Sequence, residues 1–356
     1  MSFKAQLILG KKIGKGSYGF VHAGEDHVHG KVAVKILKRR PGESNAKWAT
    51  RSAVLLDEAT HLKAATHPNV VQVHNVVRES TTDVVHLVTE FCEGGSIDKV
   101  YKKGPLTLPE VRKIITDACR GLEHIHSRGM IHRDIKPGNI LRKGAAYKIS
   151  DFGLVTNDLV LGYASANGYV CHLAPEVFDD PARGTHGTTS RRTDIWAMGM
   201  TIYRLLNGHR RHELNFPSSM SIDDFTQKIL AGGFSHSLDW LPHIPDSWRK
   251  FVHKAMHDDP GHRYQTALAM SQGLAKLPIK PPWACSVSRN EITWKLKERK
   301  RTITVKWKIH SPRRHEWYAT RSGGGKRTIS AGGVQEKIIT STAARTELEE
   351  FFANWA

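Results

Sequence analysis

The sequence predicts an α+β fold with a small β-rich lobe, a large helical lobe and a small antiparallel β-sheet with one helix. Three observations predict it. Over residues 1–91, apolar residues alternate with polar ones around glycine-rich turns, which is typical of strands. Over residues 96–278, apolar residues recur at helical spacing, most clearly over residues 108–128. After the proline-rich residues 277–282, alternation returns over residues 283–356, which indicates a domain boundary.

The composition is that of an ordinary globular protein. Of 356 residues, 39% are hydrophobic and 24% are charged. The four cysteines lie far apart without a CxxC pair, which argues against a zinc site or a disulfide framework and favours a reducing compartment. No stretch approaches the roughly 20 apolar residues that span a bilayer, and the N-terminus has no apolar signal segment. We therefore expect a cytoplasmic protein without a membrane span.

The chain is strongly basic, with a formal net charge of +19. Residues 283–356 hold 15 Lys/Arg and 7 Asp/Glu, a net charge of +8 in about a fifth of the chain. Such a field favours anionic partners, namely nucleotides, acidic proteins, nucleic acids or membrane surfaces. A solubility role is the alternative.

A glycine-rich motif follows the first expected strand, residues 7–12. Gly14, Gly16 and Gly19 with Val21 match the pattern G-x-G-x-x-G-x-V. A strand-like segment comes next, which disfavours a dinucleotide-binding fold, because there the glycines begin a helix. Glycines in such a hairpin let backbone N–H groups approach phosphates, since no Cβ intervenes. An ordinary hairpin turn is the alternative.

A lysine and a glutamate after the glycine-rich motif are candidates for an ion pair. Residues 32–35 form the end of an expected strand, in which apolar residues precede Lys35. Glu58 lies on an expected helix, residues 52–65, and we expect it to pair with Lys35. Its competitor Asp57 is turned about 100° around that helix. An ordinary surface charge is the alternative role for Lys35.

Further motifs follow in a fixed order. Residues 132–139 read His-Arg-Asp-Ile-Lys-Pro-Gly-Asn, between a helical pattern and a strand-like segment. Asp-Phe-Gly stands at 151–153 and Ala-Pro-Glu at 174–176. Asp194 opens a long helical pattern, and Arg263 ends the series. A single triplet is weak, whereas the ordered set is specific.

Together these motifs resemble the eukaryotic-like (Hanks-type) Ser/Thr protein kinases over roughly residues 7–278. The resemblance implies the bilobal protein kinase fold, with residues 1–280 as the kinase domain. It also implies phosphoryl transfer from ATP, assisted by Mg²⁺, to protein substrates. A kinase positions the reactants and neutralises charge on the transferred group, so the expected site residues are acids, amides and lysines.

The resemblance assigns each site residue a role. The expected catalytic residues are Asp134 as the base, Lys136 at the γ-phosphate, Lys35 at the other phosphates and Glu58 as the partner of Lys35. The expected Mg²⁺ ligands are Asn139 and Asp151, because hard oxygen ligands suit a hard cation. The expected nucleotide-binding residues are Gly14, Gly16, Gly19, Val21, Ala33, Lys35, Thr89, Glu90 and Cys92. Thr89 would line the back of the adenine pocket, and Cys92 would offer main-chain groups from a hinge at residues 91–96.

Other positions bear on support and specificity. The resemblance implies that Asp194 braces the catalytic loop and that Arg263 pairs with Glu176. Arg133 often grips an activation-loop phosphate in this family. The acceptors that this loop offers are Thr156, Tyr163, Ser165 and Tyr169. Because Ser/Thr kinases usually carry threonine at the position of Tyr169, dual specificity stays open.

The C-terminal segment resembles no family that we identify. We expect strands at residues 292–296, 303–309, 316–321 and 335–340, then a helix that buries Leu348, Phe351, Phe352 and Trp355. Its tryptophans form either a core or, with the Lys/Arg residues, a nucleic-acid surface. We expect residues 283–356 to be a separate docking unit; the alternative is that the final helix packs on the large lobe.

Three functional hypotheses follow from the sequence. The first is an active Ser/Thr protein kinase with a C-terminal module that docks a partner or substrate. The second is a nucleic-acid-binding or nucleic-acid-sensing protein whose output is kinase activity. The third is a pseudokinase scaffold, which the substitution at Tyr169 keeps open although the catalytic set is complete.

Overall fold

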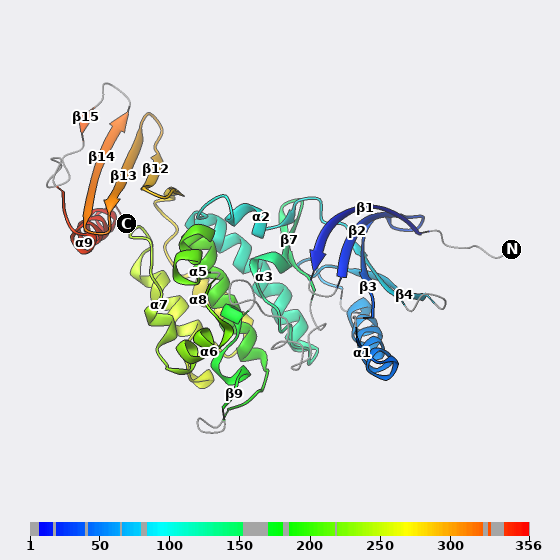
Figure 1. The fold of residues 1–356 in the computed structure, drawn as a ribbon. Helices are drawn as coiled ribbons and strands as arrows, with labels where there is room; N and C mark the ends of the chain where they lie inside the picture. Colours follow the sequence, from blue (N-terminus) through cyan, green and yellow to red (C-terminus); the bar gives the residue numbers. More distant parts are fainter. Residues whose placement is uncertain are drawn as a thin grey trace.

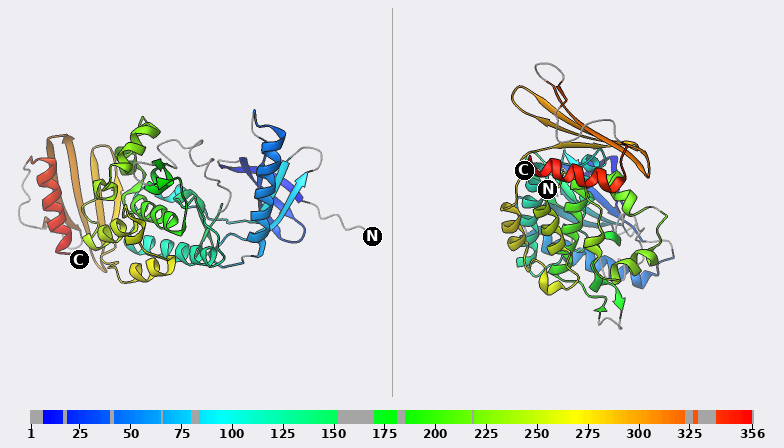
Figure 2. Two further views of the ribbon diagram at one scale, coloured as in Figure 1. Left: turned by 90° about the horizontal axis from the view of Figure 1, so that it is seen from below. Right: turned by 90° about the vertical axis from the view of Figure 1, so that its left-hand side faces the viewer.

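The structure is a computed structural model. It describes residues 7–16, 19–39, 42–64, 66–79, 84–151, 170–180, 185–217, 219–322, 327–328 and 338–355. The large lobe lies in the middle of the molecule, with the small lobe at one end and the C-terminal unit at the other (Figures 1 and 2). The expected α+β architecture is confirmed.

The small lobe is a five-stranded antiparallel sheet with one helix, α1 (Asn45–Ala64). Its spatial strand order is β1-β2-β3-β5-β4. The strands are β1 (Leu7–Gly16), β2 (Gly19–Asp26), β3 (Gly30–Leu37), β4 (Val73–Glu79) and β5 (Val84–Glu90). The helix begins seven residues before the expected residue 52, because Trp48 is buried against Leu37 and Val85 and draws the first turns onto the sheet.

The large lobe is mainly helical, as expected, with a three-stranded sheet beside the hinge. Its helices are α2 (Asp98–Tyr101), α3 (Leu108–Ser127), α5 (Arg191–Asn215), α6 (Ile222–Leu230), α7 (Asp246–Ala255) and α8 (Ala267–Ala275). The sheet contains β6 (Gly95–Ser96), β7 (Ile140–Lys143) and β8 (Ala146–Ile149). A two-stranded ribbon joins β9 (Asp179–Asp180) to β10 (Thr185–His186). Figure 1 shows α5 among the other helices of this lobe.

Helix α5 is the central element of the large lobe. Ser190 caps it by accepting a hydrogen bond from the Arg192 N–H, and its apolar residues are almost all buried. Gly208 interrupts it with φ = 75°, a left-handed conformation in which a Cβ would lie 2.8 Å from the Pro105 ring. The sequence therefore builds a kinked helix whose first half is held rigidly in the core.

The C-terminal unit is an antiparallel sheet in simple sequential order, with one helix, α9 (Ser341–Ala353). Its strands are β11 (Ala284–Val287), β12 (Glu291–Lys297), β13 (Thr302–Ser311), β14 (Arg314–Ser322) and β15 (Arg327–Thr328). The expectation of a small sheet with one helix is confirmed. The strand expected at 335–340 is wrong where the structure describes it, because Ile339 makes only an isolated bridge to His315.

The tryptophans of this sheet all point inward. Trp294, Trp307 and Trp317 are buried, and each indole N–H donates to an internal acceptor. The acceptors are His243 Nδ1 at 2.9 Å, His315 Nδ1 at 3.0 Å and Glu347 Oε2 at 2.7 Å, respectively. Buried indoles with satisfied N–H groups are core residues, which supports the first of the two roles that the sequence left open.

The sheet and α9 share a core with the large lobe. The Trp294–His243 hydrogen bond joins β12 to the segment before α7, and Phe352 lies 5.9 Å from the His243 ring. Arg345 of α9 pairs with Asp239 at 2.6 Å and donates to the Trp240 carbonyl at 2.7 Å. One continuous apolar cluster includes both parts. These contacts favour the alternative in which the final helix packs on the large lobe.

Among the residues that the structure describes, no helix is both long and apolar enough to cross a lipid bilayer.

This shared core generates a prediction about a chain that ends at Lys280. Every expected catalytic residue remains in it, but Trp294, the partner of His243, and Arg345, one of the two partners of Asp239, are lost. Apolar surface of the large lobe is also exposed. We expect the melting temperature to fall by about 5 °C or more. Thermal unfolding of the two chains measures this. Arg313→Ser, which removes an exposed charge from the turn between β13 and β14, is the control. An unchanged melting temperature after removal of residues 281–356 would make those residues an independent unit.

Candidate active site

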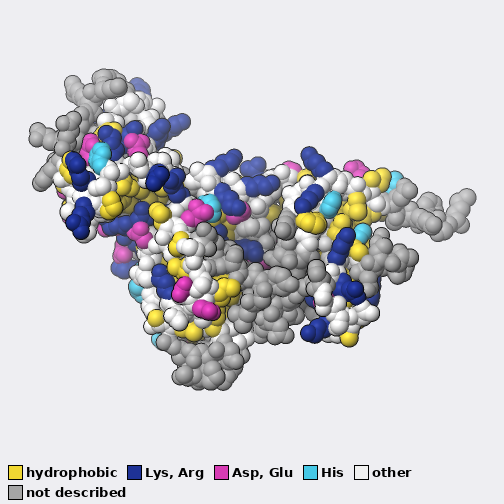
Figure 3. All heavy atoms as spheres, viewed as in Figure 1, with side chains coloured by type: hydrophobic (Ala, Val, Ile, Leu, Met, Phe, Trp, Pro, Cys, Tyr) yellow, Lys and Arg dark blue, Asp and Glu magenta, His cyan; other side chains and the backbone are white. Residues whose placement is uncertain are grey.

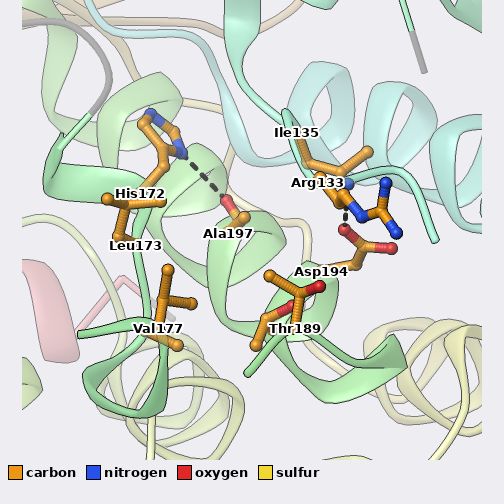
Figure 4. Close-up of a pocket in the computed structure, with 10 residues that line it drawn as sticks. Arg133, Ile135, His172, Leu173, Val177, Thr189, Asp194 and Ala197 are labelled. Atoms are coloured by element: carbon orange, nitrogen blue, oxygen red, sulfur yellow. Dashed lines mark hydrogen bonds between the residues drawn. The ribbon is translucent and has the colours of Figure 1, made fainter. Parts of the chain in front are cut away.

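The loop that carries the expected base is anchored to α5. Asp194 is 1% exposed, and its carboxylate accepts the backbone N–H groups of His132 and Arg133, both at 2.8 Å. It also lies 2.8 Å from His126 Nε2 on α3. Figure 4 shows the contact between Arg133 and Asp194. Arg133 has φ = 66°, which costs of order 1–3 kcal/mol for a residue other than glycine. The two charge-assisted hydrogen bonds offset that strain, so the expectation that Asp194 braces the loop is confirmed.

Asp134 is held in a fixed orientation by two other residues of the loop. Its Oδ1 lies 2.8 Å from Lys136 Nζ, and its Oδ2 accepts from Asn139 Nδ2 at 2.7 Å. The same Nδ2 donates to the Asp134 carbonyl at 2.8 Å. Burial raises the pKa of the Asp134 carboxyl, and the Lys136 ammonium opposes that effect. The side chain is therefore a basic, oriented carboxylate, which is what proton abstraction requires.

Asn139 has its amide nitrogen engaged within the loop. Its Nδ2 donates to the Asp134 carbonyl and carboxylate, so its amide oxygen is the group that remains for a cation. Its carbonyl accepts the Ser150 N–H at 2.9 Å, which places the next residue, Asp151, close to it. Asp151 has φ = 59°, so here too a strained backbone aims a functional side chain. One amide oxygen and one carboxylate form a hard-oxygen donor set that fits Mg²⁺.

Lys35 bridges the two lobes. It is 5% exposed on β3, and its Nζ lies 2.6 Å from Asp151 Oδ1. Burial opposes ionisation of Asp151, but the Lys35 ammonium outweighs it and holds the pKa of that carboxyl below its ordinary value. Glu58 is part of α1, but its side chain lies outside the described residues, so its pairing with Lys35 stays a prediction.

One face of the small-lobe sheet carries the expected nucleotide-binding residues. The register pairs Val21 with Lys35 and Ala33 with Thr89, so these four side chains share a face. The Thr89 hydroxyl donates to the Ala33 carbonyl at 3.3 Å. Val21, Ala33 and Thr89 are half-buried, which suits an open binding surface.

The glycine-rich segment forms the expected hairpin between two strands. Gly14 pairs with Val21, and Gly16 pairs with Gly19. At Gly19 a Cβ would lie 2.0 Å from the Ile36 carbonyl oxygen, so only glycine fits. Residues 17 and 18 at the turn lie outside the described residues.

Two hinge residues have surroundings that the sequence did not indicate. The Glu90 carboxylate is buried and contacts Lys143 at 2.7 Å, Lys148 at 2.6 Å and the Gln72 N–H at 2.8 Å. Burial opposes ionisation of Glu90, but the lysines outweigh it and lower the pKa. Only the main chain of Glu90 is therefore left for a nucleotide. Burial raises the pKa of the Cys92 thiol to about 11, and the Cys92 carbonyl accepts the Gly95 N–H at 3.1 Å.

The Ala-Pro-Glu segment is tied to the rest of the lobe by an ion pair. Arg263 is 2% exposed and binds Glu176 in a two-pronged contact, at 2.6 and 2.8 Å. This confirms the expected pairing. The activation-loop acceptors that the sequence proposed, Thr156, Tyr163, Ser165 and Tyr169, lie outside the described residues.

A pocket lies between the catalytic loop, α5 and the segment before the Ala-Pro-Glu triplet (Figure 4). Its lining includes Arg133, Ile135, Leu173 and Val177. His172 also lines it; its Nδ1 donates to the Ala197 carbonyl at 3.2 Å and its Nε2 accepts from Arg204 at 2.7 Å.

The sequence gave no sign of this histidine's environment. Burial and the Arg204 guanidinium lower the pKa of His172 well below its ordinary value, so the ring is neutral. Arg204 also donates to the Tyr101 hydroxyl at 2.5 Å, which joins α5 to α2. In the sequence, His172 is marked only by its place two residues before the Ala-Pro-Glu triplet. That spacing does not identify the partner of the histidine.

Comparison with known proteins agrees with this geometry. The model of the protein kinase domain matches residues 7–274. The chain is 31% identical over 266 residues to the serine/threonine-protein kinase ssp1 of Schizosaccharomyces pombe, covering 71% of the chain and 40% of that protein. It is 31% identical over 261 residues to PrkC of Bacillus subtilis, covering 72% and 38%. It is 29% identical over 279 residues to PknB of Mycolicibacterium smegmatis, covering 76% and 42%.

PrkC and PknB are both named serine/threonine-protein kinases. The chain spans about two fifths of the length of these three relatives. The match lies over both lobes and includes Asp194, Asp134 and Lys35. The chain belongs to the protein kinase family.

Proposed function

We propose that the protein is an ATP- and Mg²⁺-dependent protein kinase that phosphorylates serine or threonine hydroxyls. The observation that carries the proposal is the orientation of Asp134 by Lys136 and Asn139, in the site where Lys35 meets Asp151. A base, a cation and two hard-oxygen ligands converge there. Phosphoryl transfer needs this combination, because the protein must position the hydroxyl and neutralise charge on the transferred group.

In this proposal each residue has one task. Asp134 accepts the proton of the attacking hydroxyl, and Lys136 faces the charge that develops on the transferred group. Lys35 orients the phosphates that enter beside Asp151. Asn139 and Asp151 would hold Mg²⁺, which supplies charge neutralisation at the phosphate oxygens.

The choice of serine and threonine rests on two supports. The three relatives named above carry serine/threonine-protein kinase in their names. Lys136 is the residue expected at its position in that class. Tyr169, which raised dual specificity, lies outside the described residues. The assignment to serine and threonine therefore rests on the names of the relatives and on Lys136.

The two alternative functions receive less support. A pseudokinase would be expected to lack part of the catalytic set, whereas the described residues supply the base, its lysine and both expected metal ligands. Nucleic-acid binding by stacking on tryptophans loses its basis, because those indoles are internal. A cytoplasmic location is part of the proposal, since ATP is plentiful there and the four free thiols would stay reduced.

The first test replaces the base. Asp134→Asn keeps the size of the side chain but removes its basicity, so we expect kcat to fall about 10²- to 10⁴-fold while ATP still binds. Phosphate incorporation into a generic serine/threonine peptide measures this. Asp246→Asn, which removes an exposed carboxylate on α7, is the control and should act like the wild type. If Asp134→Asn keeps the wild-type rate, Asp134 is not the catalytic base.

The second test concerns pH. Lys136 opposes the rise that burial causes in the pKa of Asp134, so replacing it by methionine lets that pKa rise further. A base with a higher pKa becomes protonated at a higher pH. The acidic limb of the kcat/KM profile should therefore move to higher pH in Lys136→Met. Lys136→Arg retains the charge and should keep the limb near its wild-type position; equal profiles in Lys136→Met and wild type would contradict the assignment.

The third test concerns the metal and is read without activity. In the wild type, ATP with Mg²⁺ should raise the melting temperature more than ATP with EDTA, because the metal joins the phosphates to the protein. Asp151→Ala should abolish that difference, and Asn139→Ala should reduce it. Thermal unfolding with and without each component measures this. A wild type that ATP stabilises equally in EDTA would favour the pseudokinase hypothesis.

A further inference from the structure

The C-terminal sheet has two chemically different faces. The inner face carries the tryptophans and packs on α9 and the large lobe. The alternate positions of β12, β13 and β14 form the outer face, which is dominated by lysine and threonine. In Figure 3 this part of the molecule carries many Lys and Arg side chains.

The positive charge is concentrated at one turn of this sheet. Residues 295–301, here called the basic hairpin, connect the end of β12 to the start of β13. They contain five Lys/Arg and one Glu, a net charge of +4. Every charged residue among them is exposed. Glu298 pairs with Arg301 at 3.2 Å, so the only acid is already used within the turn.

The other lysines of the outer face are neutralised locally. Lys306 pairs with Glu291 at 3.3 Å, and Lys308 pairs with Glu316 at 3.6 Å. By contrast, Lys295, Lys297, Arg299 and Lys300 make no ion pair with any residue that the structure describes. Four exposed cations without an ion pair to a described residue leave a local excess of positive charge that an anionic partner would relieve.

The chemistry of the hairpin favours a polypeptide over other anions. A single-stranded nucleic acid would use exposed aromatic rings for stacking, but the hairpin has none and Lys308 covers the ring of Tyr318 at 5.0 Å. Its one large apolar residue, Leu296, is 5% exposed, so nothing there would insert into a lipid surface. The flexible ammonium groups and arginine of an open β-turn match carboxylates on an extended chain.

We infer that the basic hairpin docks an acidic segment of the protein substrate, at a distance from the phosphorylated residue. This inference rests on the proposed kinase function. The C-terminal unit is fixed to the large lobe by Arg345 and His243, so a segment bound there is tethered to the active site. Tethering raises the effective concentration of the phosphoacceptor and therefore lowers KM without changing kcat.

The test compares two peptides with the full-length protein. Both share one phosphoacceptor sequence and a flexible Gly/Ser linker; one ends in a run of glutamates and the other in glutamines. We expect KM to be about tenfold lower for the glutamate peptide, with equal kcat. The difference should disappear when the salt concentration is raised from about 0.05 M to about 0.5 M, because salt screens exposed charges.

Variants locate the effect on the sheet. Arg299→Ser with Lys300→Ser should abolish the preference for the glutamate peptide and leave KM for the glutamine peptide unchanged. Arg313→Ser with Arg314→Ser is the matched control, since it removes two exposed charges from the turn at the opposite end of β13. That control should keep the preference. A preference that survives the hairpin variant would overturn the inference, as would equal KM values in the wild type.

A binding measurement separates docking from catalysis. Fluorescence anisotropy of the labelled glutamate peptide, without ATP, should show binding to the wild type and to the control variant but not to the hairpin variant. If neither peptide is phosphorylated, the proposed function fails, while the anisotropy still decides the docking inference. Tighter binding of a single-stranded oligonucleotide of the same charge would instead assign the hairpin to nucleic acid and overturn the inference.

Discussion

The buried carboxylate of Asp194 is the contact on which the site depends. It accepts two backbone N–H groups from a loop whose Arg133 lies in the left-handed region, and it does so from the first turn of a buried helix. Hydrogen bonds to a charged group contribute about 1.5–3 kcal/mol each, enough to hold one strained residue. With the loop held, Asp134 and Asn139 orient each other. The orientation of Asp134 thus depends on a carboxylate that lies on another element, α5.

Helix α5 also fixes the positions of two neighbouring parts of the structure. Arg204 near its middle binds His172 and Tyr101, which supports the pocket beside the catalytic loop. Arg211, beyond the kink at Gly208, pairs with Asp239. Asp239 in turn pairs with Arg345 of α9, so its carboxylate links the C-terminal unit to α5. Arg204 fixes relative positions because its planar guanidinium donates to both His172 and Tyr101.

Much of the fold followed from periodicity and spacing. The strand-like and helical parts of the two lobes were expected from periodicity. The catalytic loop, the Arg263–Glu176 pair and the bracing role of Asp194 were expected because the motifs resemble those of protein kinases. The start of α1 was predicted too late in the chain, because Trp48 lies outside the apolar pattern from which the helix was predicted. Contacts with β3 and β5 bury this residue. The strand expected at 335–340 is reduced to one bridge where it is described, because alternation alone does not supply a neighbouring strand.

The sequence by itself determined the protein kinase family, because the ordered motifs resemble that family, and it predicted the residues of the site. It also determined that the C-terminal segment is a basic sheet, since alternation shows in the residues. Only the tertiary structure decided that the tryptophans are core residues and that the Glu90 carboxylate pairs with lysines. Trp294 contacts His243 across 51 residues of sequence, and Glu90 contacts Lys148 across 58. Such contacts depend on how whole elements pack. A local pattern of side chains therefore cannot identify a partner so distant in the sequence.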